Sequence, residues 1–381
     1  MNIERPTSNI EWEKRNKRYL HLISRAGMYL DETTHRMKCL HGCFNALTIW
    51  TIFLLCLIGC TSNETPQIET KDNTIKPGDS GPVVYRLKWL YNTSVAGEIW
   101  AQESGIFKAH GLTVKLREGG PEQDAIKDLE LGRAHFGVAS ADQVIRAAAK
   151  GADVVVLAQI FQANPLQWIY AKDKRAIVKP QDLKGLCVGV TYGGNDESIL
   201  SALLRMYKIG PDDLELYAVH YDFNPFWKGE VELWPVYRNT QGIILQKKMA
   251  QTGKQAGFFN PNTFGIRFVA NSLITSKKVY TEQPQLVRVF TEAVLEGWRD
   301  AMDPELELKV AEAIHRFDPE TPVPVIQQQL AETRALVVPE SPRAIGTIDT
   351  RAWKQTADIL ITQGLISQEV DITSLLKGPL R

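Results

Sequence analysis

The sequence predicts an α/β fold of two lobes, each a mainly parallel sheet flanked by helices. From residue 83 onward, short strands rich in β-branched and aromatic residues alternate with helical stretches of about ten residues, which is typical of βαβ units. A second, similar alternation begins at Lys184-Gly185. Because the same alternation of strands and helices occurs twice, we expect two units of similar architecture.

Length and composition agree with a globular protein of this size. The chain has 381 residues, of which 44% are hydrophobic and 23% are charged, as in ordinary globular domains. Its formal net charge is zero, so there is no electrostatic reason to expect nucleic acid as a partner. Beyond residue 60, no apolar run approaches the ~20 residues that a membrane-spanning helix needs.

The first unit is expected to contain four strands separated by helices. The strands are predicted at residues 83–90, 112–116, 135–139 and 154–158. Helices are predicted around residues 99–107, over residues 122–131, and from the cap at Ser140-Ala141-Asp142 to Gly151.

The second unit is expected to begin with a strand over residues 186–190. Further strands are predicted at residues 214–220 and 231–234, and an extended segment over residues 267–274 is interpreted as the return to the first lobe. An amphipathic stripe predicts a helix over residues 283–302. Residues 304–317, 324–335 and 350–363 are predicted as further helices that pack against the first lobe.

Ligands of such sheets bind outside the carboxyl ends of the strands, and the residues there share one character. Most are aromatic, amide-bearing or small, which suits a planar heterocycle that needs flat faces and hydrogen bonds. The candidate ligand-binding residues are Trp89, Tyr91, Asn92, Glu118, Ser140, Tyr192, Gly193, Asn195, Asp196, Tyr221, Asp222, Trp234, Tyr237, Arg238 and Asn239. Asp222 or Glu118 would accept from an amino group, and Arg238 would bind a carbonyl or acidic group.

Several of these residues also have a structural interpretation. Trp89 stands at a strand end and would then belong to the core. Trp234 with Pro235 would form a wall between the lobes, and Arg238 would pair with Asp222 without touching a ligand. Glycines such as Gly119 would let backbone N–H groups approach a ligand closely.

No constellation for catalysis or metal binding is found. The sequence lacks a Walker loop, an HExxH pair, paired CxxC motifs and a GxSxG elbow, so we expect no enzyme, no metal, no cofactor and no catalytic residue. Cys187, within a predicted buried strand, is interpreted as a small core residue.

The N-terminal region resembles the signal of a bacterial lipoprotein. Leu57-Ile58-Gly59-Cys60 follows an apolar run over residues 44–58, as in a lipobox that is cut before a lipidated cysteine. We expect residues 37–59 to be the signal peptide, with translation starting at Met37 and residues 1–36 a doubtful extension. Residues 60–82 would be a flexible tether. The alternative is a type II anchored protein with a short cytoplasmic tail.

Three segments resemble the periplasmic solute-binding proteins of ABC transporters. They are GIFKAHGLTV at residues 105–114, GRAHFGV at residues 132–138 and DLKGLCVGV at residues 182–190. Residues 221–225, YDFNP, and residues 229–241, GEVELWPVYRNTQ, look most like the heterocycle-binding branch of the group for sulfonates, nitrate, thiamine-pyrimidine precursors and riboflavin. The resemblance covers residues 85–302.

The resemblance implies a type II periplasmic-binding-protein fold whose two lobes close on a ligand about a hinge of two crossover segments, near residues 170–175 and 269–276. Lobe 1 would comprise residues 83–174 and 271–381, and lobe 2 residues 175–270. The protein would be a monomer, held by lipid on the periplasmic side of the membrane or the cell surface. Its partners would be the ABC permease subunits and their cytoplasmic ATPase.

The resemblance leaves the function open among four alternatives, three of which are binding proteins that differ in ligand and one of which is an enzyme. A thiamine-pyrimidine precursor comes first and riboflavin second. A sulfonate or nitrate would demand an anion site with few carboxylates. The fungal pyrimidine synthase of thiamine biosynthesis shares the fold and is an enzyme, but it carries a Cys-Cys-Cys-Phe-Cys run where residues 255–260 here read QAGFFN; this departure and the lipobox argue against that alternative.

Overall fold

The structure, a computed structural model, describes residues 81–120, 123–192, 194–219, 222–338 and 345–378. The expected signal at residues 37–59, Met37, the lipidation site Cys60 and most of the tether lie outside the described residues. Within the ranges that are described, no helix is both long and apolar enough to cross a membrane.

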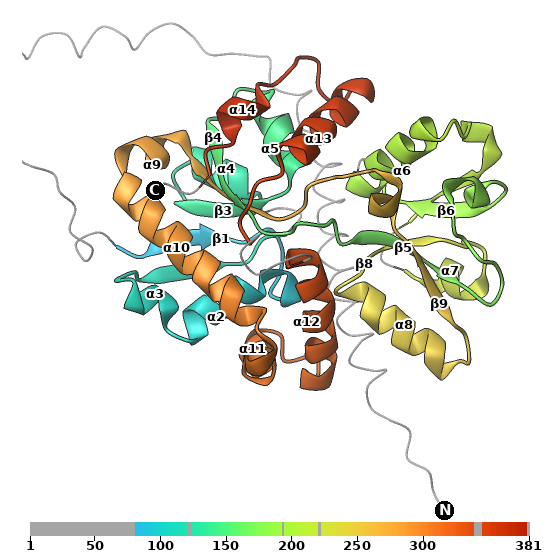
Figure 1. The fold of residues 1–381 in the computed structure, drawn as a ribbon, viewed down its shortest axis with the longest axis horizontal. Coiled ribbons are helices and arrows are strands. Elements are labelled where there is room, and N and C mark those ends of the chain that lie inside the picture. The colour runs from blue at the N-terminus through green and yellow to red at the C-terminus, as the bar shows by residue number, and fades with distance from the viewer. Residues whose placement is uncertain (1–80, 121–122, 193, 220–221, 339–344, 379–381) are drawn as a thin grey trace, which may run out of the picture. The chain divides into compact units, whose positions relative to one another are not determined.

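The first lobe is built on a five-stranded sheet with the order β2-β1-β3-β10-β4 (Figure 1). Its strands are β1 (Val83–Arg86), β2 (Val114–Arg117), β3 (Phe136–Ala139), β4 (Val154–Gln159) and β10 (Ser272–Ser276). β1 pairs in parallel with β2 and β3. β10 lies between β3 and β4 and is antiparallel to both.

Two helical layers cover this sheet. One layer shares an apolar core with the sheet around Phe136, which stacks on Phe290 with ring centroids 3.8 Å apart. Its helices are α2 (Ala96–Glu103), α3 (Ile106–Ala109), α10 (Pro284–Ala301), α11 (Glu307–Phe317) and α12 (Val323–Val337). The other layer packs on the opposite core around Trp353 and contains α4 (Ala125–Glu130), α5 (Ala141–Ala148), α13 (Thr350–Thr362) and α14 (Ile372–Leu375). The short helices η1 (Thr93–Val95), α9 (Lys277–Glu282) and η5 (Pro304–Leu306) connect these elements.

Helices α2 and α10 approach each other more closely than a side chain at position 97 or 297 would allow. A Cβ atom on Gly97 would lie 2.2 Å from the ring of Trp298, and one on Gly297 would lie 2.5 Å from the carbonyl oxygen of Gly97. Glycine at both positions therefore lets the long helix α10 lie directly on α2.

The second lobe has mixed pairing, whereas the sequence predicted a mainly parallel sheet. β5 (Leu166–Ala171) pairs antiparallel with β8 (Trp234–Tyr237) and β9 (Ala256–Phe259). β6 (Cys187–Val190) and β7 (Glu215–Ala218) form a parallel pair, and a single bridge from Val188 to Leu233 joins the two groups. The helices are α6 (Asn195–Met206), α7 (Asn224–Lys228) and α8 (Gln241–Gln251), with the short η2 (Pro180–Leu183), η3 (Pro211–Asp213) and η4 (Pro261–Phe264).

The two crossover segments follow from which sheet each strand joins. β4 ends at Gln159 in the first sheet and β5 begins at Leu166 in the second; β9 ends at Phe259 and β10 returns to the first sheet at Ser272. The crossings therefore occupy residues 160–165 and 260–271. The first lies earlier than the expected residues 170–175, because β5 pairs along its whole length inside the second sheet.

Strand β8 begins three residues later than the segment predicted as a strand, and it includes Pro235. Proline lacks the N–H that a central strand must donate, so it is tolerated at the edge of a sheet. β8 is an edge strand of the order β8-β5-β9, which explains why Pro235 does not end it.

The C-terminal helices contact both lobes, although the sequence predicted packing on the first alone. α13 packs on α5 of lobe 1, and Gln363 just after it donates from Nε2 to the carbonyl of Ser198 in α6 at 2.8 Å. In α12, Thr333 Oγ1 accepts from Asn239 Nδ2 at 3.1 Å. These helices thus connect the two sheets in addition to the two crossovers.

Candidate functional site

A cavity of about 370 Å³ opens between the two lobes, and residues of both lobes line it. The lining residues from lobe 1 are Lys88, Trp89, Gly120, Gln123, Asp124, Ala125, Val138, Ala139, Ser140, Asp142, Gln143 and Arg146. Those from lobe 2 are Gly194, Asn195 and Tyr237. A volume of this size lies within the range of small-molecule sites.

The cavity lies where the strand order predicts a ligand. Lys88 and Trp89 follow β1, Ser140 follows β3, and Asn195 begins the helix that follows β6. Parallel strands bring their carboxyl ends to one edge of a sheet, and the helices that follow begin there with free backbone N–H groups. The N-terminal ends of α4, α5 and α6 all contribute lining residues.

Two aromatic side chains reach the cavity from different lobes. The backbone of Trp89 is fixed because its carbonyl accepts from the N–H of Gly119 at 3.0 Å. Tyr237 stands at the end of β8, and its hydroxyl lies 3.5 Å from Asn195 Nδ2. Gly119 serves chain packing, since a Cβ there would lie 2.2 Å from the carbonyl of Leu87.

Ser140 and Asp124, which precede α5 and α4, form hydrogen bonds within the first turns of these helices. Ser140 is 2% exposed, and its N–H and hydroxyl both donate to Gln143 Oε1, at 3.1 and 3.0 Å. Asp124 Oδ1 accepts from the N–H groups of Ile126 and Lys127. Capping by Asp124 stabilises α4 by about 1 kcal/mol, and the bonds between Ser140 and Gln143 fix the first turn of α5 beside the cavity.

Four charged residues line the cavity: Lys88, Arg146, Asp124 and Asp142. None of them was a candidate from the sequence. Asp142 stands at the second position of α5, and its Oδ1 is buried without a hydrogen-bond partner among the described residues. The sequence did mark Ser140-Ala141-Asp142 as the start of a helix, but it could not show which side of that first turn faces a cavity.

Of the described candidates, Trp89, Ser140, Asn195 and Tyr237 line the cavity. Three others support the loop after β1 instead. Asn92 caps η1 by accepting from Ser94 N–H at 2.7 Å, Glu118 Oε1 accepts from Tyr91 N–H at 3.0 Å, and the Tyr91 ring packs on Phe317 at 4.8 Å.

The remaining lobe 2 candidates differ widely in exposure. Tyr192 is 58% exposed. Asp196 is buried and accepts from Thr191 N–H at 2.6 Å, and burial raises the pKa of its carboxyl. Asp222 accepts from Asn224 N–H within its own turn. Trp234 is 2% exposed in the lobe 2 core. Gly193 and Tyr221 lie outside the described residues.

Arg238 and Asn239 join the two lobes. Arg238 pairs with Glu332 of α12 at 2.5 Å, where the sequence suggested Asp222 as the alternative partner, and its guanidinium lies over the Phe258 ring at 4.3 Å. Burial lowers the pKa of Arg238. Asn239 is fully buried, and its Nδ2 donates to Ser94 and Thr333, both at 3.1 Å.

We expect the Arg238–Glu332 pair to be energetically coupled. Glu332→Gln should destabilise the protein more than the double variant with Arg238→Met does, because the single change leaves a half-buried guanidinium whose Nη1 already lacks a partner among the described residues. Urea unfolding of the four proteins should give a coupling of about 1–2 kcal/mol. Strictly additive losses would contradict an interaction between α12 and β8 at this point.

Cys187, the free cysteine of the described residues, is half-buried at the amino end of β6. Burial and the nearby Glu215 and Glu232 raise the pKa of its thiol, which disfavours the thiolate. Among the described residues, no group of three or more His, Cys, Asp or Glu side chains is placed to hold a metal ion.

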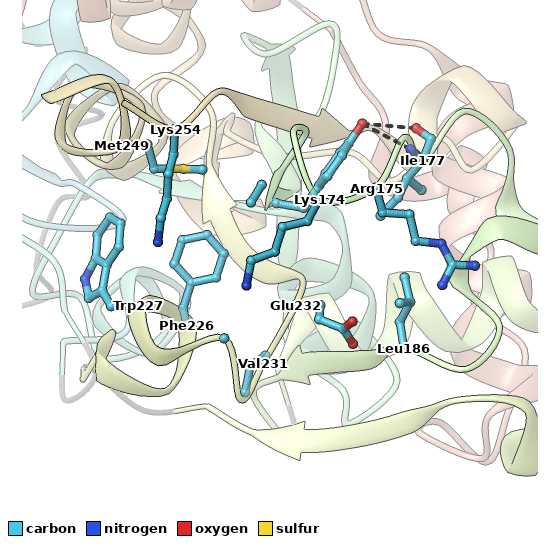
Figure 2. A pocket seen from close by; sticks show the side chains of 13 residues that line it. Lys174, Arg175, Ile177, Leu186, Phe226, Trp227, Val231, Glu232, Met249 and Lys254 are labelled. Carbon is cyan, nitrogen blue, oxygen red and sulfur yellow. Dashed lines mark hydrogen bonds between the residues drawn. The ribbon is translucent and has the colours of Figure 1, made fainter. Parts of the chain in front are cut away.

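A second, smaller cavity of about 50 Å³ lies within lobe 2. In Figure 2 the side chains of Lys174 and Lys254 both extend toward Phe226. The dashed lines in Figure 2 mark the contacts of the Tyr170 hydroxyl with the backbone of Ile177, 3.3 Å to its carbonyl and 3.4 Å to its N–H. At this volume the cavity holds little more than a water molecule, so the interlobe cavity is the candidate ligand site.

Solved structures resemble this chain over more than three quarters of its length. The aliphatic sulphonate binding protein SsuA of Escherichia coli superposes with a TM-score of 0.61 at 18% identity, covering 79% of this chain and 94% of that one. The alkanesulfonate-binding protein SsuA of Xanthomonas axonopodis, bound to MOPS, gives 0.57 at 18% identity, covering 78% and 99%. These likenesses confirm the two-lobed periplasmic-binding-protein fold.

Two curated proteins are similar in sequence. The riboflavin-binding protein RibY of Chloroflexus aurantiacus is 23% identical over 354 residues, which is 86% of this chain and 94% of the relative. A putative thiamine biosynthesis protein of Haemophilus influenzae is 24% identical over 195 residues, 50% of this chain and 60% of the relative. The family model described as NMT1/THI5 like matches residues 92–306. That match covers more than half of the sequence, and the chain belongs to the NMT1/THI5-like family.

Proposed function

We propose that this protein is the solute-binding subunit of an ABC importer and that it captures a planar nitrogen heterocycle between its lobes. The observation that carries the proposal is the pairing of Trp89 from lobe 1 with Tyr237 from lobe 2 on one cavity of about 370 Å³. Aromatic faces contributed by both lobes offer a flat ring two surfaces, and contact with both favours the closed form.

Riboflavin is the ligand that we favour. The similarity to the riboflavin-binding protein RibY extends over 94% of that relative. A tricyclic isoalloxazine with its ribityl chain also fills a cavity of about 370 Å³ more fully than a single pyrimidine ring would. Amide and cationic groups at the rim, such as Gln123, Asn195 and Lys88, suit ring carbonyls and ribityl hydroxyls.

A thiamine-type aminopyrimidine is the second candidate. It is favoured by the family itself and by the similarity to a putative thiamine biosynthesis protein, although that similarity covers a smaller part of both chains. A sulfonate is less suited to this cavity. Asp124 and Asp142 line it together with Lys88 and Arg146, and carboxylates repel an anion.

The contacts of the lining residues support capture without turnover. Ser140, a potential nucleophile, donates its hydroxyl to Gln143, and Asp124, a potential base, caps α4. The thiol of Cys187 stands at the amino end of β6, away from the helix N-termini that line the cavity. We therefore propose a binding protein and not an enzyme of the family.

The same proposal places the protein outside the cytoplasm beside its permease. Lipidation at Cys60 after removal of residues 37–59 would tether it to the membrane. Mass analysis of the mature N-terminus tests this part independently of ligand binding, and a chain that retains residues 1–59 without lipid would contradict it.

We expect the purified protein to bind riboflavin and to be stabilised by it. Stacking on Trp89 and Tyr237 should quench flavin fluorescence, and a ligand that binds only the folded state raises the melting temperature by mass action. At 100 times Kd the stabilisation should be about 2.7 kcal/mol. Titrations with riboflavin, an aminopyrimidine, taurine and nitrate should show a response to a heterocycle and none to the two anions.

The outcomes of these titrations separate the alternatives. A response to the aminopyrimidine alone would favour the second ligand and leave the capture function in place. Binding of taurine or nitrate without any heterocycle would overturn the proposed ligand class. Because Trp89 and Tyr237 come from different lobes, their alanine variants should each weaken binding, and a ligand that tolerates the loss of both would not lie between them.

A further inference from the structure

We propose that Asp142 is the residue that selects ligands with an N–H donor on the heterocycle edge. The inference rests on the proposed function, since it concerns the same cavity. It adds the chemical identity of the ligand group that the cavity recognises. The donor would be the imide N–H of an isoalloxazine or the amino group of an aminopyrimidine.

The first reason is that Asp142 is a cavity carboxylate with free accepting capacity. Its Oδ1 is buried and has no hydrogen-bond partner among the described residues. The other lining carboxylate, Asp124, uses its Oδ1 to cap α4. The residue as a whole is partly exposed where it lines the cavity. A carboxylate offers about four acceptor positions, and a carboxylate oxygen without a partner gains a hydrogen bond when a donor reaches it.

The second reason is that the neighbouring cations do not neutralise Asp142. Lys88 and Arg146 line the same cavity, and Arg146 stands one helical turn after Asp142 in α5. No ion pair within 4.0 Å joins either of them to Asp142, whereas Arg86 and Arg133 both pair with Asp128 of α4. The carboxylate is therefore available to a ligand.

The position in α5 offers a purely structural alternative. A carboxylate in the first turn of a helix interacts favourably with the helix dipole, typically by less than 1 kcal/mol. That role would make Asp142 matter for stability alone and would leave ligand discrimination unchanged. A test must therefore measure the ratio of the Kd values for two ligands, because the affinity for one ligand alone does not separate these roles.

Riboflavin and 3-methylriboflavin provide this comparison on the full protein. They differ only in the imide N–H, which the methyl group replaces. A site that hydrogen-bonds a ligand N–H rejects the analogue that lacks it, because the acceptor is left unpaired. We expect wild type to bind riboflavin about 10- to 100-fold more tightly than the methylated form, which corresponds to one charge-assisted hydrogen bond.

Two variants assign the discrimination to Asp142. Asp142→Ala removes the acceptor and should bring the ratio of the two Kd values close to one. Asp142→Asn keeps the size of the side chain and one carbonyl acceptor, so the ratio should fall only in part, and this separates the hydrogen bond from a steric effect of the methyl group. Melting temperatures without ligand report any loss of folding.

Each other outcome counts against the inference in a distinct way. Equal affinities of wild type for the two flavins would show that the protein does not recognise the imide N–H. An unchanged ratio of the two Kd values in Asp142→Ala would mean that another residue accepts from this N–H. Either result would overturn the inference, while riboflavin capture stands. If wild type binds neither flavin, the same comparison is made with a 4-aminopyrimidine and its dimethylamino analogue. Failure to bind any of these four would overturn the proposed function together with the inference.

Discussion

Trp234→Ala is expected to destabilise the protein by about 3–5 kcal/mol, the cost of truncating a buried tryptophan. Trp234 is 2% exposed and belongs to the lobe 2 core with Ile169, Val236 and Met249. Its ring lies 5.5 Å from that of Phe223 and 6.4 Å from that of Phe226. The midpoint of urea unfolding should shift accordingly, and any loss of ligand binding should follow from the unfolded fraction.

Trp89→Ala is the matched control on the other lobe. Trp89 is half-buried and lines the interlobe cavity, so its truncation should leave the unfolding midpoint nearly unchanged. It should weaken riboflavin binding by about 2 kcal/mol, or about 30-fold in Kd, as expected for an aromatic anchor in a binding site. A Trp234→Ala variant with wild-type stability and weak binding would show that these roles are reversed.

The sequence could not separate these two tryptophans, and the reason is physical. Both stand at or beside a predicted strand, and in each case an aromatic residue and an amide follow within five residues, Tyr91 and Asn92 after Trp89 and Tyr237 and Asn239 after Trp234. The local pattern therefore gives the two tryptophans the same prediction. Their roles are decided by which elements cover them. Trp234 is covered by Phe223 and Phe226 around α7, whereas Trp89 faces a cavity that forms only because a distant second lobe lies opposite.

The fold itself was largely predictable because it depends on periodic patterns. The stripe that predicted a helix over residues 283–302 matches α10, Pro284–Ala301. The strand–helix alternation predicted β1 to β4 and the helices between them. Strand direction in lobe 2 was not predictable, because β5, β8 and β9 pair antiparallel only through contacts between segments far apart in the chain.

Asn239 shows why part of the candidate site could not be identified from sequence. An amide side chain after a strand can hydrogen-bond a ligand or another part of the chain equally well. Here it donates to Ser94 and Thr333 across the lobes, and the helix that supplies Thr333 follows more than 90 residues later in the chain. Such a contact leaves no local signal, whereas Ser140 and Asn195 stand at helix starts after strands, and both line the cavity.

Glu98 is a second position where burial has a large expected effect, and it lies in the lobe 1 core. The side chain is 1% exposed within α2. Its Oε1 accepts from the Tyr85 hydroxyl at 3.1 Å, and Tyr85 and the Trp298 side chain both lower the pKa of the carboxyl, by less than burial raises it. Burial raises the pKa of Glu98 from 4.5 to about 7, so the folded protein holds a proton that the unfolded chain releases.

Stability should therefore fall as the pH rises through the window from about 4.5 to about 7, because the folded state binds more protons than the unfolded state there. The loss above pH 7 is about 3 kcal/mol, at 1.36 kcal/mol for each pKa unit. Glu98→Gln cannot titrate and still accepts from Tyr85. This variant should therefore match the stability of wild type near pH 4.5 and exceed it by up to about 3 kcal/mol at pH 8.

Subtracting the two curves of unfolding free energy against pH removes the contribution of other buried groups such as Asp196. Parallel curves would mean that Glu98 has the same proton affinity in both states, and its burial among Tyr85 and the α2–α10 packing would then carry no electrostatic cost.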